Sequence, residues 1–430
     1  MKRVPASELT RKELEELFNG GQNLNAMKSD LVHLGIQRII EETLEAKIQE
    51  ILGRGYYDHR QEGQKGHRNG YRMSHLDTGE GRINYAVPQL RGVENGELKK
   101  LRNRISGRSE RLEDLSIEMY ARGLSTRDIE KLWTDEQGRA MLSKSAVSEL
   151  TERLWEEYEE FATRDLSDLQ ILYLFLDGIA EKLTPGFRRE AVLCAWGIME
   201  DGEKKLIHVA PGTKESTDCV KEFIEDMTRR GLRAPVMIST DGAPGLIRAV
   251  EECYPDSLRQ RCLAHKIRNI LGKLPEHAHD EFKAAARASY QATSVALART
   301  LAEDVRERFY KDHPTAVMCF EEDFEACINQ LRCPIGHRKA VRTTNLLERL
   351  FVEERRRMKI MPTISGERPV LKLMFAALVR GSERWKKLKV TEFELRQLNQ
   401  LRIDLKKKEN ALPIKNKSSD STLRKIYSKN

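Results

Sequence analysis

Between residues 171 and 262, apolar runs alternate with turn residues in an order that few folds accommodate. The segments "ILYLFLDGIA" and "EAVLCAWGIME" are apolar enough for buried strands, "KKLIHVAPG" predicts a third strand and "PVMIST" a fourth. The helical pattern "CVKEFIEDMTRRGL" separates the third strand from the fourth, and "SLRQRCLAH" indicates a short fifth strand. A strand that returns to the same sheet after a helix predicts a mixed sheet covered by helices, which is an α/β architecture.

Two acidic residues come directly after apolar runs in this segment. Asp177 ends "YLFLD" and Asp241 ends "MISTD", and a glycine follows each of them. Sheets of this kind place ligands at the carboxyl ends of their strands, so neighbouring strands bring both carboxylates within reach of one divalent cation. Acids before glycine are also common turn residues, and an Asp ahead of a helix often caps it. The pair alone leaves both interpretations open.

A third carboxylate, Glu348, lies in a strongly basic helix predicted over residues 343–361, whose first residues, "TTN", are able to cap it. Arg355 follows two turns later on the same face. A glutamate that projects from this helix toward the strand ends completes a two-metal site, with Arg355 facing a DNA phosphate. The alternative is an exposed acid paired with Arg349, Arg355 or Lys359.

Basic charge is concentrated in two flanking segments. The formal net charge is +8, from 75 Lys and Arg against 67 Asp and Glu, which favours an anionic partner. Residues 54–108 contain 12 basic and 6 acidic residues, and residues 404–430 contain 8 and 3. In the first segment, two predicted strands around "DTGEG" form a basic hairpin whose Arg68 and Arg72 are candidate phosphate contacts. A hairpin packed on the neighbouring helices is the alternative.

Residues 109–165 show helical patterns in the order of a helix-turn-helix DNA reader. One helix ends at a glycine, a second begins at Ser125, and a third starts near Ser143 or Ser145. We expect the third to read bases as a recognition helix, and a plain helical bundle is the alternative, because the connection before it is long. The candidate DNA contacts here are Arg127, Lys144, Ser145 and Ser148.

An ordered set of motifs resembles the Mutator-type family of bacterial insertion-sequence transposases. The motifs are "YARGLSTRDIEKLW", "SKSAVSEL", "LFLDGI", "STDGAPG", "RCLAHKIRN" and "TTNLLERLFVEERRR", and the resemblance extends from roughly Asn69 to Trp385. It implies a ribonuclease H-like core with the catalytic triad Asp177, Asp241 and Glu348, Arg355 as the following basic residue, and a helical insertion ahead of the Glu. The chain departs from the family pattern at Phe351, where an Asn is expected.

The resemblance also implies that Cys262 and His265 of "CLAH" form a signature of the core beside Asp241. As half of a zinc site this pair lacks a convincing second half, because His277 and His279 are the only near candidates. We therefore interpret it as shaping the active site.

Pattern and resemblance together divide the chain into seven segments. They are an N-terminal helical region (1–54), a basic β-hairpin segment (55–108), a helix-turn-helix-like DNA-binding domain (109–165), the first part of the catalytic core (166–265), a helical insertion domain (266–335), the last part of the core with the Glu helix (336–400) and a basic disordered tail (401–430).

The function implied is DNA transposition, in which the protein cleaves DNA at terminal inverted repeats and transfers the strand into target DNA. The triad would hold two Mg²⁺ (or Mn²⁺) ions, and Arg356 and Arg357 are further candidate DNA contacts. Two element ends must be brought together, so a homodimer or larger assembly is expected. A DNA-binding regulator that has lost catalysis and a junction- or RNA-cutting nuclease on the same fold are the alternatives.

Cysteine usage and hydropathy suggest a compartment. The seven cysteines are irregularly spaced, which indicates reduced thiols, and no apolar run approaches the length of a membrane span. We expect a cytoplasmic, nucleoid-associated bacterial protein.

Overall fold

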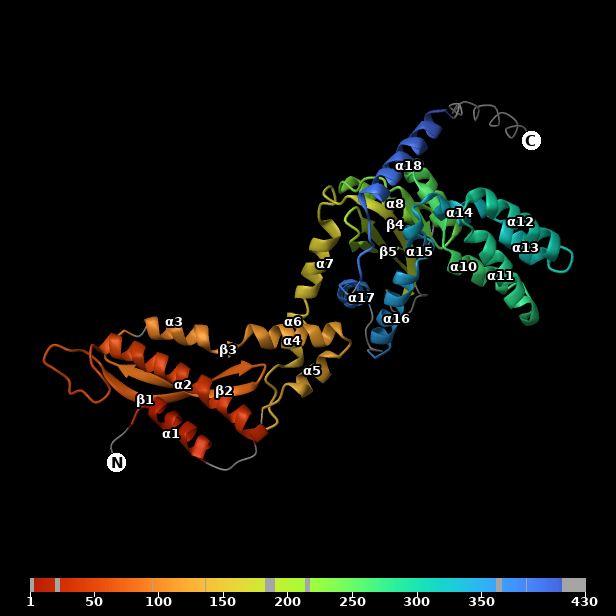
Figure 1. Ribbon diagram of the computed structural model, residues 1–430. Helices are drawn as coiled ribbons and strands as arrows, with labels where there is room; N and C mark the ends of the chain where they lie inside the picture. The colour runs from red at the N-terminus through yellow and green to blue at the C-terminus, as the bar shows by residue number, and fades with distance from the viewer. Residues whose placement is uncertain are drawn as a thin grey trace, which may run out of the picture. The chain divides into compact units, whose positions relative to one another are not determined.

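The computed structural model describes residues 4–19, 24–94, 96–135, 137–181, 190–212, 217–360, 366–383 and 385–411. The chain forms two compact units, residues 1–154 and residues 155–430, whose helices and strands are drawn in Figure 1. None of the helices in the described part of the chain combines the length and apolar character that a membrane crossing requires.

The N-terminal unit begins with two helices and a small sheet. Helices α1 (Ala6–Asn19) and α2 (Leu24–Leu52) precede the hairpin of β1 (His67–Thr78) and β2 (Gly81–Arg91), which confirms the two strands expected around "DTGEG". Then follow α3 (Gly96–Ile105) and β3 (Gly107–Arg108), and the sheet has the order β2-β1-β3 with β1 and β2 antiparallel.

Strand β2 attaches the hairpin to the helices. Tyr85 of β2 shares a hydrophobic core with Leu44 of α2. The buried carboxylate of Glu41 in α2 accepts hydrogen bonds from Thr10 Oγ1 of α1 at 2.7 Å and from the Ala86 backbone N–H of β2 at 2.9 Å. Burying a carboxylate is unfavourable unless its oxygens are paired, and here both are. The hairpin thus packs on helices, the alternative that its composition left open.

Three helices complete this unit: α4 (Glu110–Ala121), α5 (Thr126–Leu132) and α6 (Lys144–Leu150). The predicted start at Ser125 is confirmed, because Ser125 and Asp128 form a capping box at the start of α5. Helix α6 is capped by Ser143 and ends before α7 (Arg153–Thr163) begins, so the third predicted helix is divided in two.

The C-terminal unit is built on a mixed five-stranded sheet, which confirms the α/β class. Its strands are β4 (Ile171–Glu181), β5 (Glu190–Met199), β6 (Lys204–Gly212), β7 (Met237–Thr240) and β8 (Leu258–Arg261), in the order β6-β5-β4-β7-β8. Strands β4, β5 and β6 pair antiparallel, whereas β7 pairs parallel to β4, and β8 parallel to β7.

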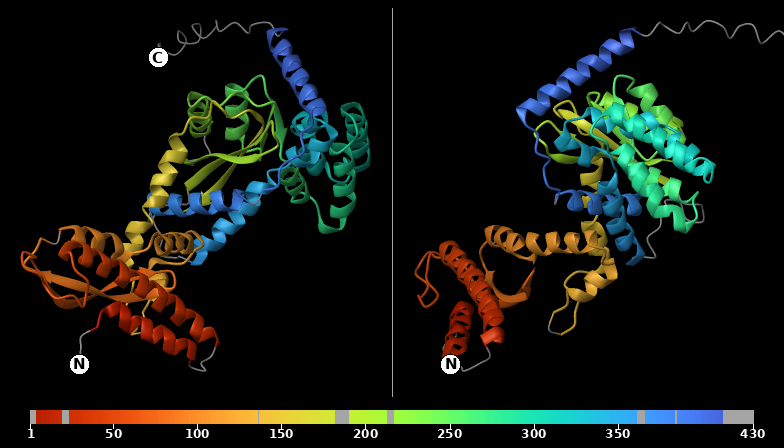
Figure 2. Two further views of the ribbon diagram at one scale, coloured as in Figure 1. Left: turned by 60° about the vertical axis from the view of Figure 1, so that its left-hand side comes forward. Right: turned by 45° about the vertical axis from the view of Figure 1, so that its right-hand side comes forward.

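Helices cover both faces of this sheet (Figures 1 and 2). Helices α8 (Thr217–Arg229) and α9 (Pro244–Cys253) pack on one face, against Leu174 and Leu176 of β4. Helices α16 (Asn345–Ile360) and α17 (Glu367–Ser382) pack on the other, against Phe175. Side chains alternate between the two faces of a strand, so Asp177 shares the face of Phe175, toward α16.

The chain between β8 and α16 is almost wholly helical, as expected for residues 266–333. It contains α10 (Leu263–Leu271), η1 (Glu276–Ala278), α11 (His279–Tyr290), α12 (Val295–Phe309), α13 (Pro314–Glu321), α14 (Phe324–Ile328), η2 (Asn329–Arg332) and α15 (Ile335–Val341). Helices α10 to α14 share a core around Phe282, Tyr290 and Phe320, and α14 and η2 contact the edge strand β8. These helices therefore form a layer of their own beyond that edge (Figure 1).

Two expectations need correction. Asp177 does not end its strand, because β4 stays paired with β5 as far as Glu181, which lies opposite Glu190. The segment after residue 400 is not disordered throughout, because α18 runs over Glu392–Ala411 and packs Leu398 and Leu405 against the core. Residues 412–430 lie outside the described residues.

The stacked rings of Trp196 and Phe175 allow the packing of this core to be tested by substitution. Trp196 is fully buried, and the two ring centroids lie 3.8 Å apart. We expect Trp196→Ala to lower the free energy of unfolding by about 3–5 kcal/mol, because it leaves a cavity in a close-packed layer. Guanidinium unfolding followed by circular dichroism measures the change. Val352→Ala, at an exposed position of α16, is the matched control and changes stability by less than about 0.5 kcal/mol. Equal shifts for the two variants would contradict the packing described.

Candidate active site

Parallel pairing of β4 with β7 sets two aspartates side by side. Leu176 is in register with Thr240, so the residues that follow, Asp177 and Asp241, stand on adjacent strands. Asp177 is only 5% exposed, and its Oδ1 accepts a hydrogen bond from the Gly178 backbone N–H at 3.0 Å. The predicted pair of carboxylates is therefore brought together by the sheet.

Burial and a neighbouring charge both act on the Asp177 carboxyl. Burial raises the pKa of Asp177 to about 7, and the charge of Asp241 acts in the same direction. The charge of His265 and hydrogen bonds from Gly178 and Thr344 oppose the rise in this pKa without cancelling it. A carboxyl that resists ionisation beside a second carboxylate is a place where a cation is stabilising.

The turn after β7 fixes the Asp241 carboxylate. Its Oδ1 accepts a hydrogen bond from the Ala243 backbone N–H at 2.9 Å, and Ala243 itself occupies the N-cap position of α9. Gly242 has φ of +105°, and a Cβ there would lie 1.7 Å from Cζ of Arg261. Glycine suits this turn because residues with side chains rarely adopt that backbone conformation, and a side chain there would also displace the Arg261 guanidinium. Asp241 thus orders the turn ahead of the helix and leaves the cap position to Ala243.

Cys262, which follows β8, links the end of β7 to the start of α16, the helix that carries Glu348. Its backbone N–H donates to the Thr240 carbonyl at 2.8 Å, and its sulfur accepts from the Thr344 backbone N–H at 3.4 Å. The Thr344 carbonyl in turn accepts from the Glu348 N–H at 3.3 Å, in the first turn of α16. Burial favours a raised pKa for the Cys262 thiol, but hydrogen bonds with His265 and Thr344 outweigh it and lower the pKa below its ordinary value.

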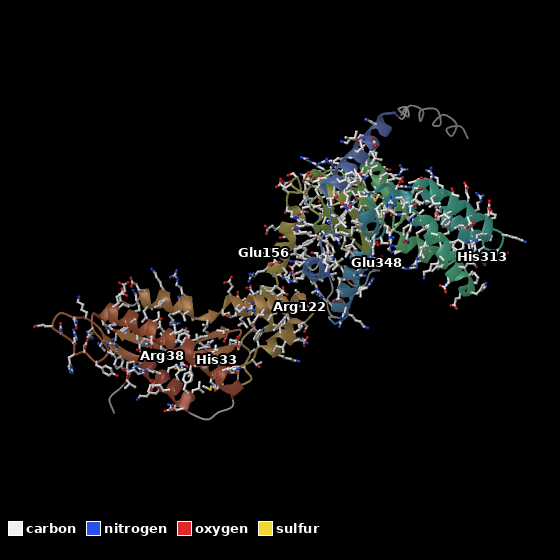
Figure 3. The ribbon with its side chains drawn as sticks, viewed as in Figure 1. His33, Arg38, Arg122, Glu156, His313 and Glu348 are labelled. Carbon is white, nitrogen blue, oxygen red and sulfur yellow. The ribbon has the colours of Figure 1, made fainter. Side chains whose placement is uncertain are left out.

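His265 connects the first turn of α10 with Glu348, which is labelled in Figure 3. Its Nε2 lies 3.2 Å from Glu348 Oε1. The contact with Cys262 raises the pKa of His265 to about 9 against the effect of burial, and the charges of Asp177 and Glu348 add to the rise. The imidazole is therefore charged at neutral pH. Arg268, one turn further along α10, donates to the same Glu348 oxygen at 3.3 Å.

The donor set suits a hard divalent cation at the two aspartates. Mg²⁺ is usually held by one or two carboxylates with waters and substrate phosphates. Within the ranges described above, no three His, Cys, Asp or Glu side chains stand together as ligands of one metal ion. The structure brings Asp177 and Asp241 together, while it holds Glu348 in ion pairs with His265 and Arg268.

Comparison with known proteins places the chain in a family. It matches the family described as "Transposase, Mutator family" over residues 9–388. The chain belongs to the Mutator family of transposases. The transposase for insertion sequence element ISRM5 of Rhizobium meliloti (strain 1021) is 31% identical over 81% of this chain and 87% of that protein. The transposase for IS256 in transposon Tn4001 of Staphylococcus aureus is 28% identical over 84% and 92%, and that for IS6120 of Mycolicibacterium smegmatis is 31% identical over 62% and 83%.

The basic residues predicted after Glu348 differ in exposure in this Mutator-family chain. Arg355 and Arg356 are exposed on α16, whereas Arg357 is half-buried. Arg355 and Arg356 are therefore accessible at the surface of α16.

The DNA contacts predicted in the N-terminal unit also divide into two groups. Those on the helices are exposed: Arg127 on α5, and Lys144, Ser145 and Ser148 on α6. On β1, Arg72 is exposed, but Arg68 is half-buried, donates to the Gly55 carbonyl at 3.0 Å and lies over the Tyr56 ring. Arg68 thus has a structural role within the hairpin segment.

Sequence reasoning missed Thr344 and Arg268 as residues that shape the site. The spacing of Arg268 from His265 in "LAHKIRN" puts both on one face of α10, and that spacing was the available signal. Thr344 was visible only as a possible cap, because its contact with Cys262 joins positions far apart in the chain.

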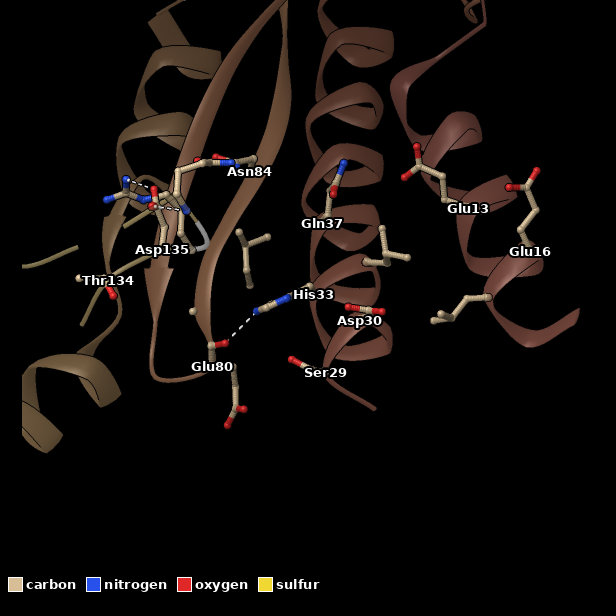
Figure 4. Close-up of a pocket in the computed structure, with 16 residues that line it drawn as sticks. Glu13, Glu16, Ser29, Asp30, His33, Gln37, Glu80, Asn84, Thr134 and Asp135 are labelled. Carbon is tan, nitrogen blue, oxygen red and sulfur yellow. Dashed lines mark hydrogen bonds and ion pairs between the residues drawn. The ribbon is translucent and has the colours of Figure 1, made fainter. Parts of the chain in front are cut away.

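The N-terminal unit has a separate cavity of about 740 Å³. Carboxylates are prominent in its lining, among them Glu13, Glu16 and Asp30, and His33 Nε2 lies 2.8 Å from the Glu80 carbonyl oxygen (Figure 4). Negative charge disfavours a phosphate backbone, so we assign this cavity no part in DNA binding.

The raised pKa of Asp177 predicts how stability changes with pH in metal-free buffer. Between the ordinary pKa of 3.8 and about 7, the folded protein keeps a proton at Asp177 that the unfolded chain has released. The stability that this proton contributes is therefore lost as pH rises through that window. Asp177→Asn removes the loss, so we expect the variant to exceed the wild type by roughly 1–4 kcal/mol above neutral pH.

Guanidinium unfolding at several pH values with chelator present measures this difference. Asp312→Asn, at an exposed position after α12, is the control and should follow the wild-type curve. If the wild type and Asp177→Asn show the same pH profile, Asp177 titrates as an ordinary carboxyl and the crowding of the two aspartates is refuted.

Proposed function

We propose that this protein is a transposase that cleaves DNA at the terminal inverted repeats of its element and transfers the strand into target DNA. The observation that carries the proposal is the pair Asp177 and Asp241 on adjacent parallel strands, with His265 and Glu348 beside it. Three antiparallel strands followed by two parallel ones support a ribonuclease H-like core for the C-terminal unit. The names of the relatives support the same reaction.

In this proposal Asp177, Asp241 and Glu348 would hold the divalent metal, as two Mg²⁺ or Mn²⁺ ions. Bound there, such a pair supplies charge that stabilises the attacking and leaving oxygens of phosphoryl transfer. The chain's own groups hold the acids in place: the Gly178 N–H orients Asp177, and the His265 imidazolium orients Glu348 through its Nε2. Arg355, exposed on α16, is the candidate for binding a phosphate of the substrate.

The N-terminal unit supplies DNA recognition in this proposal. Helices α4, α5 and α6 act as a helix-turn-helix, with α6 reading bases through Lys144, Ser145 and Ser148 and α5 contacting phosphate through Arg127. All four residues are exposed. A homodimer or larger assembly follows from the need to hold two element ends at once.

The first test of the proposal is chemical. Purified protein is mixed with Mg²⁺ or Mn²⁺ and the DNA that flanks its gene, and the release of a 3′-OH and its joining to target DNA are followed on gels. We expect Asp241→Asn to reduce joining by more than about 100-fold, since substitutions outside the direct ligands of a metal already cost up to that much. Asp312→Asn, at the exposed position used above, should join normally. Tight binding of flanking DNA without cleavage by the wild type would instead identify a DNA-binding regulator.

The DNA-reading role of α5 and α6 gives a separate prediction. Arg127→Ala should weaken binding to all sequences alike and reduce the slope of log affinity against log salt by about 1, because one phosphate contact is lost. Ser148→Ala should leave the salt slope unchanged and relax the preference for repeat DNA over unrelated DNA. Fluorescence anisotropy at several salt concentrations distinguishes the two. If both variants bind like the wild type, the helical-bundle alternative holds.

A further inference from the structure

A cavity of about 490 Å³ lies in the C-terminal unit, among α10, α11 and the start of α16. Its buried lining is apolar and consists mainly of Leu263 and Ile267 of α10 and Tyr290 of α11. Its more exposed lining is polar and includes Arg287 and Gln291. The cavity therefore offers an apolar floor below a cationic and amide rim, a combination suited to a ligand with a flat apolar part and an anionic part.

This cavity adjoins the acidic site through shared backbone. Leu263 directly follows Cys262, and its N–H donates to the Arg342 carbonyl at 2.9 Å. Asn345, which also lines the cavity, precedes Glu348 by about one helical turn on the same side of α16. The cavity therefore borders the first turn of the helix that carries Glu348.

The rim has the donors that a nucleotide requires. Arg342 NH1 donates to Gln291 Oε1 at 2.8 Å, which orients the guanidinium and leaves the Gln291 amide group as a donor. Arg287 has no acidic partner among the described residues, although most exposed arginines of these helices are paired, such as Arg299 with Glu325 at 2.9 Å. An uncompensated arginine next to a second one is a ready site for a phosphate.

We propose that this cavity binds a single unpaired nucleotide of the DNA at the cleavage site. Its base lies on Leu263 and Ile267, above the fully buried Tyr290, and its phosphate on Arg287 and Arg342. A base within a duplex presents only its edges, so an apolar floor meets the face of a base only when that base has left the stack. This inference rests on the proposed function, because it takes the neighbouring acids as the site of DNA cleavage.

The experiment uses the full chain and duplexes of flanking DNA that carry 2-aminopurine at successive positions around the element end. A chelator removes divalent metal ions, so the DNA stays uncleaved during the measurement. Binding is followed by anisotropy in parallel. We expect fluorescence to rise at one position when the protein binds, because an unstacked 2-aminopurine is no longer quenched. The inactive Asp241→Asn variant should give the same rise, which keeps this readout separate from the test of catalysis.

Two variants test whether the rise comes from this cavity. Ala264→Phe, at a half-buried lining position of α10, fills it and should abolish the rise, with circular dichroism to verify folding. Arg287→Ala, at an exposed position where a folding defect is not expected, should weaken DNA binding about tenfold and lower the salt slope by about 1. Arg306→Ala, an exposed arginine of α12 outside the cavity, is the matched control and should change neither quantity.

Three outcomes overturn the inference. The first is a rise that persists in folded Ala264→Phe, together with DNA binding by Arg287→Ala that equals that of the wild type. The second is wild-type protein that binds and cleaves the DNA with no rise at any position. The third is binding of free deoxyadenosine monophosphate without any response from the DNA, which would assign the cavity to a small ligand.

Discussion

Repulsion between two carboxylates is the interaction that the C-terminal unit has to withstand. The parallel pairing of β4 with β7 forces Asp177 and Asp241 together, and burial and this repulsion raise the pKa of Asp177 to about 7. A shift of that size corresponds to a few kcal/mol of destabilisation while the carboxyl is ionised. Burial is the larger part of this cost and the charge of Asp241 the smaller part. Each fully buried apolar side chain contributes about 1.5–3 kcal/mol, so a few of the core residues on the two faces of the sheet offset the whole cost. The thick apolar layers around the sheet thus make an unfavourable acid pair possible.

The charge of Glu348 is handled differently from that of the aspartates. His265 and Arg268 both contact its Oε1, so one negative charge faces two positive ones. The Cys262 sulfur and the Thr344 backbone lock the two helices that carry these groups, since the bonds between them cross from α10 to α16. The charge of His265 also favours the ionised form of Asp177, but the pKa of Asp177 stays raised, so the aspartate pair is compensated less fully than Glu348. In the proposed function, that difference is the reason for a metal ion to bind first at the aspartate pair.

Local signals in the sequence predicted more of this fold than of this site. Apolar runs predicted four of the five strands, β4 to β7, and the capping box at Ser125 predicted the start of α5, because both signals depend on neighbours in the chain. The apolar pattern "ILYLFLDGIA" already indicated a strand as far as Ala180, and the pairing with β5 shows that β4 continues past Asp177 to Glu181. The link between Cys262 and Thr344 and the three-element contact of Glu41 were out of reach, because each joins segments far apart in the sequence. The two aspartates were found because each comes directly after an apolar run in the sequence.

The helical segment between β8 and α16 places positive charge beside the acids. Carboxylates repel the phosphates of any DNA that approaches them. The helices of this segment bring Arg268 into contact with Glu348 and set Arg287 and Arg342 around the neighbouring cavity, so positive charge borders the acids on that side. A shorter connection between β8 and α16 would bring the Glu helix to the sheet without these cations. The length of the segment is therefore explained by what it adds beside the acids as well as by its own core.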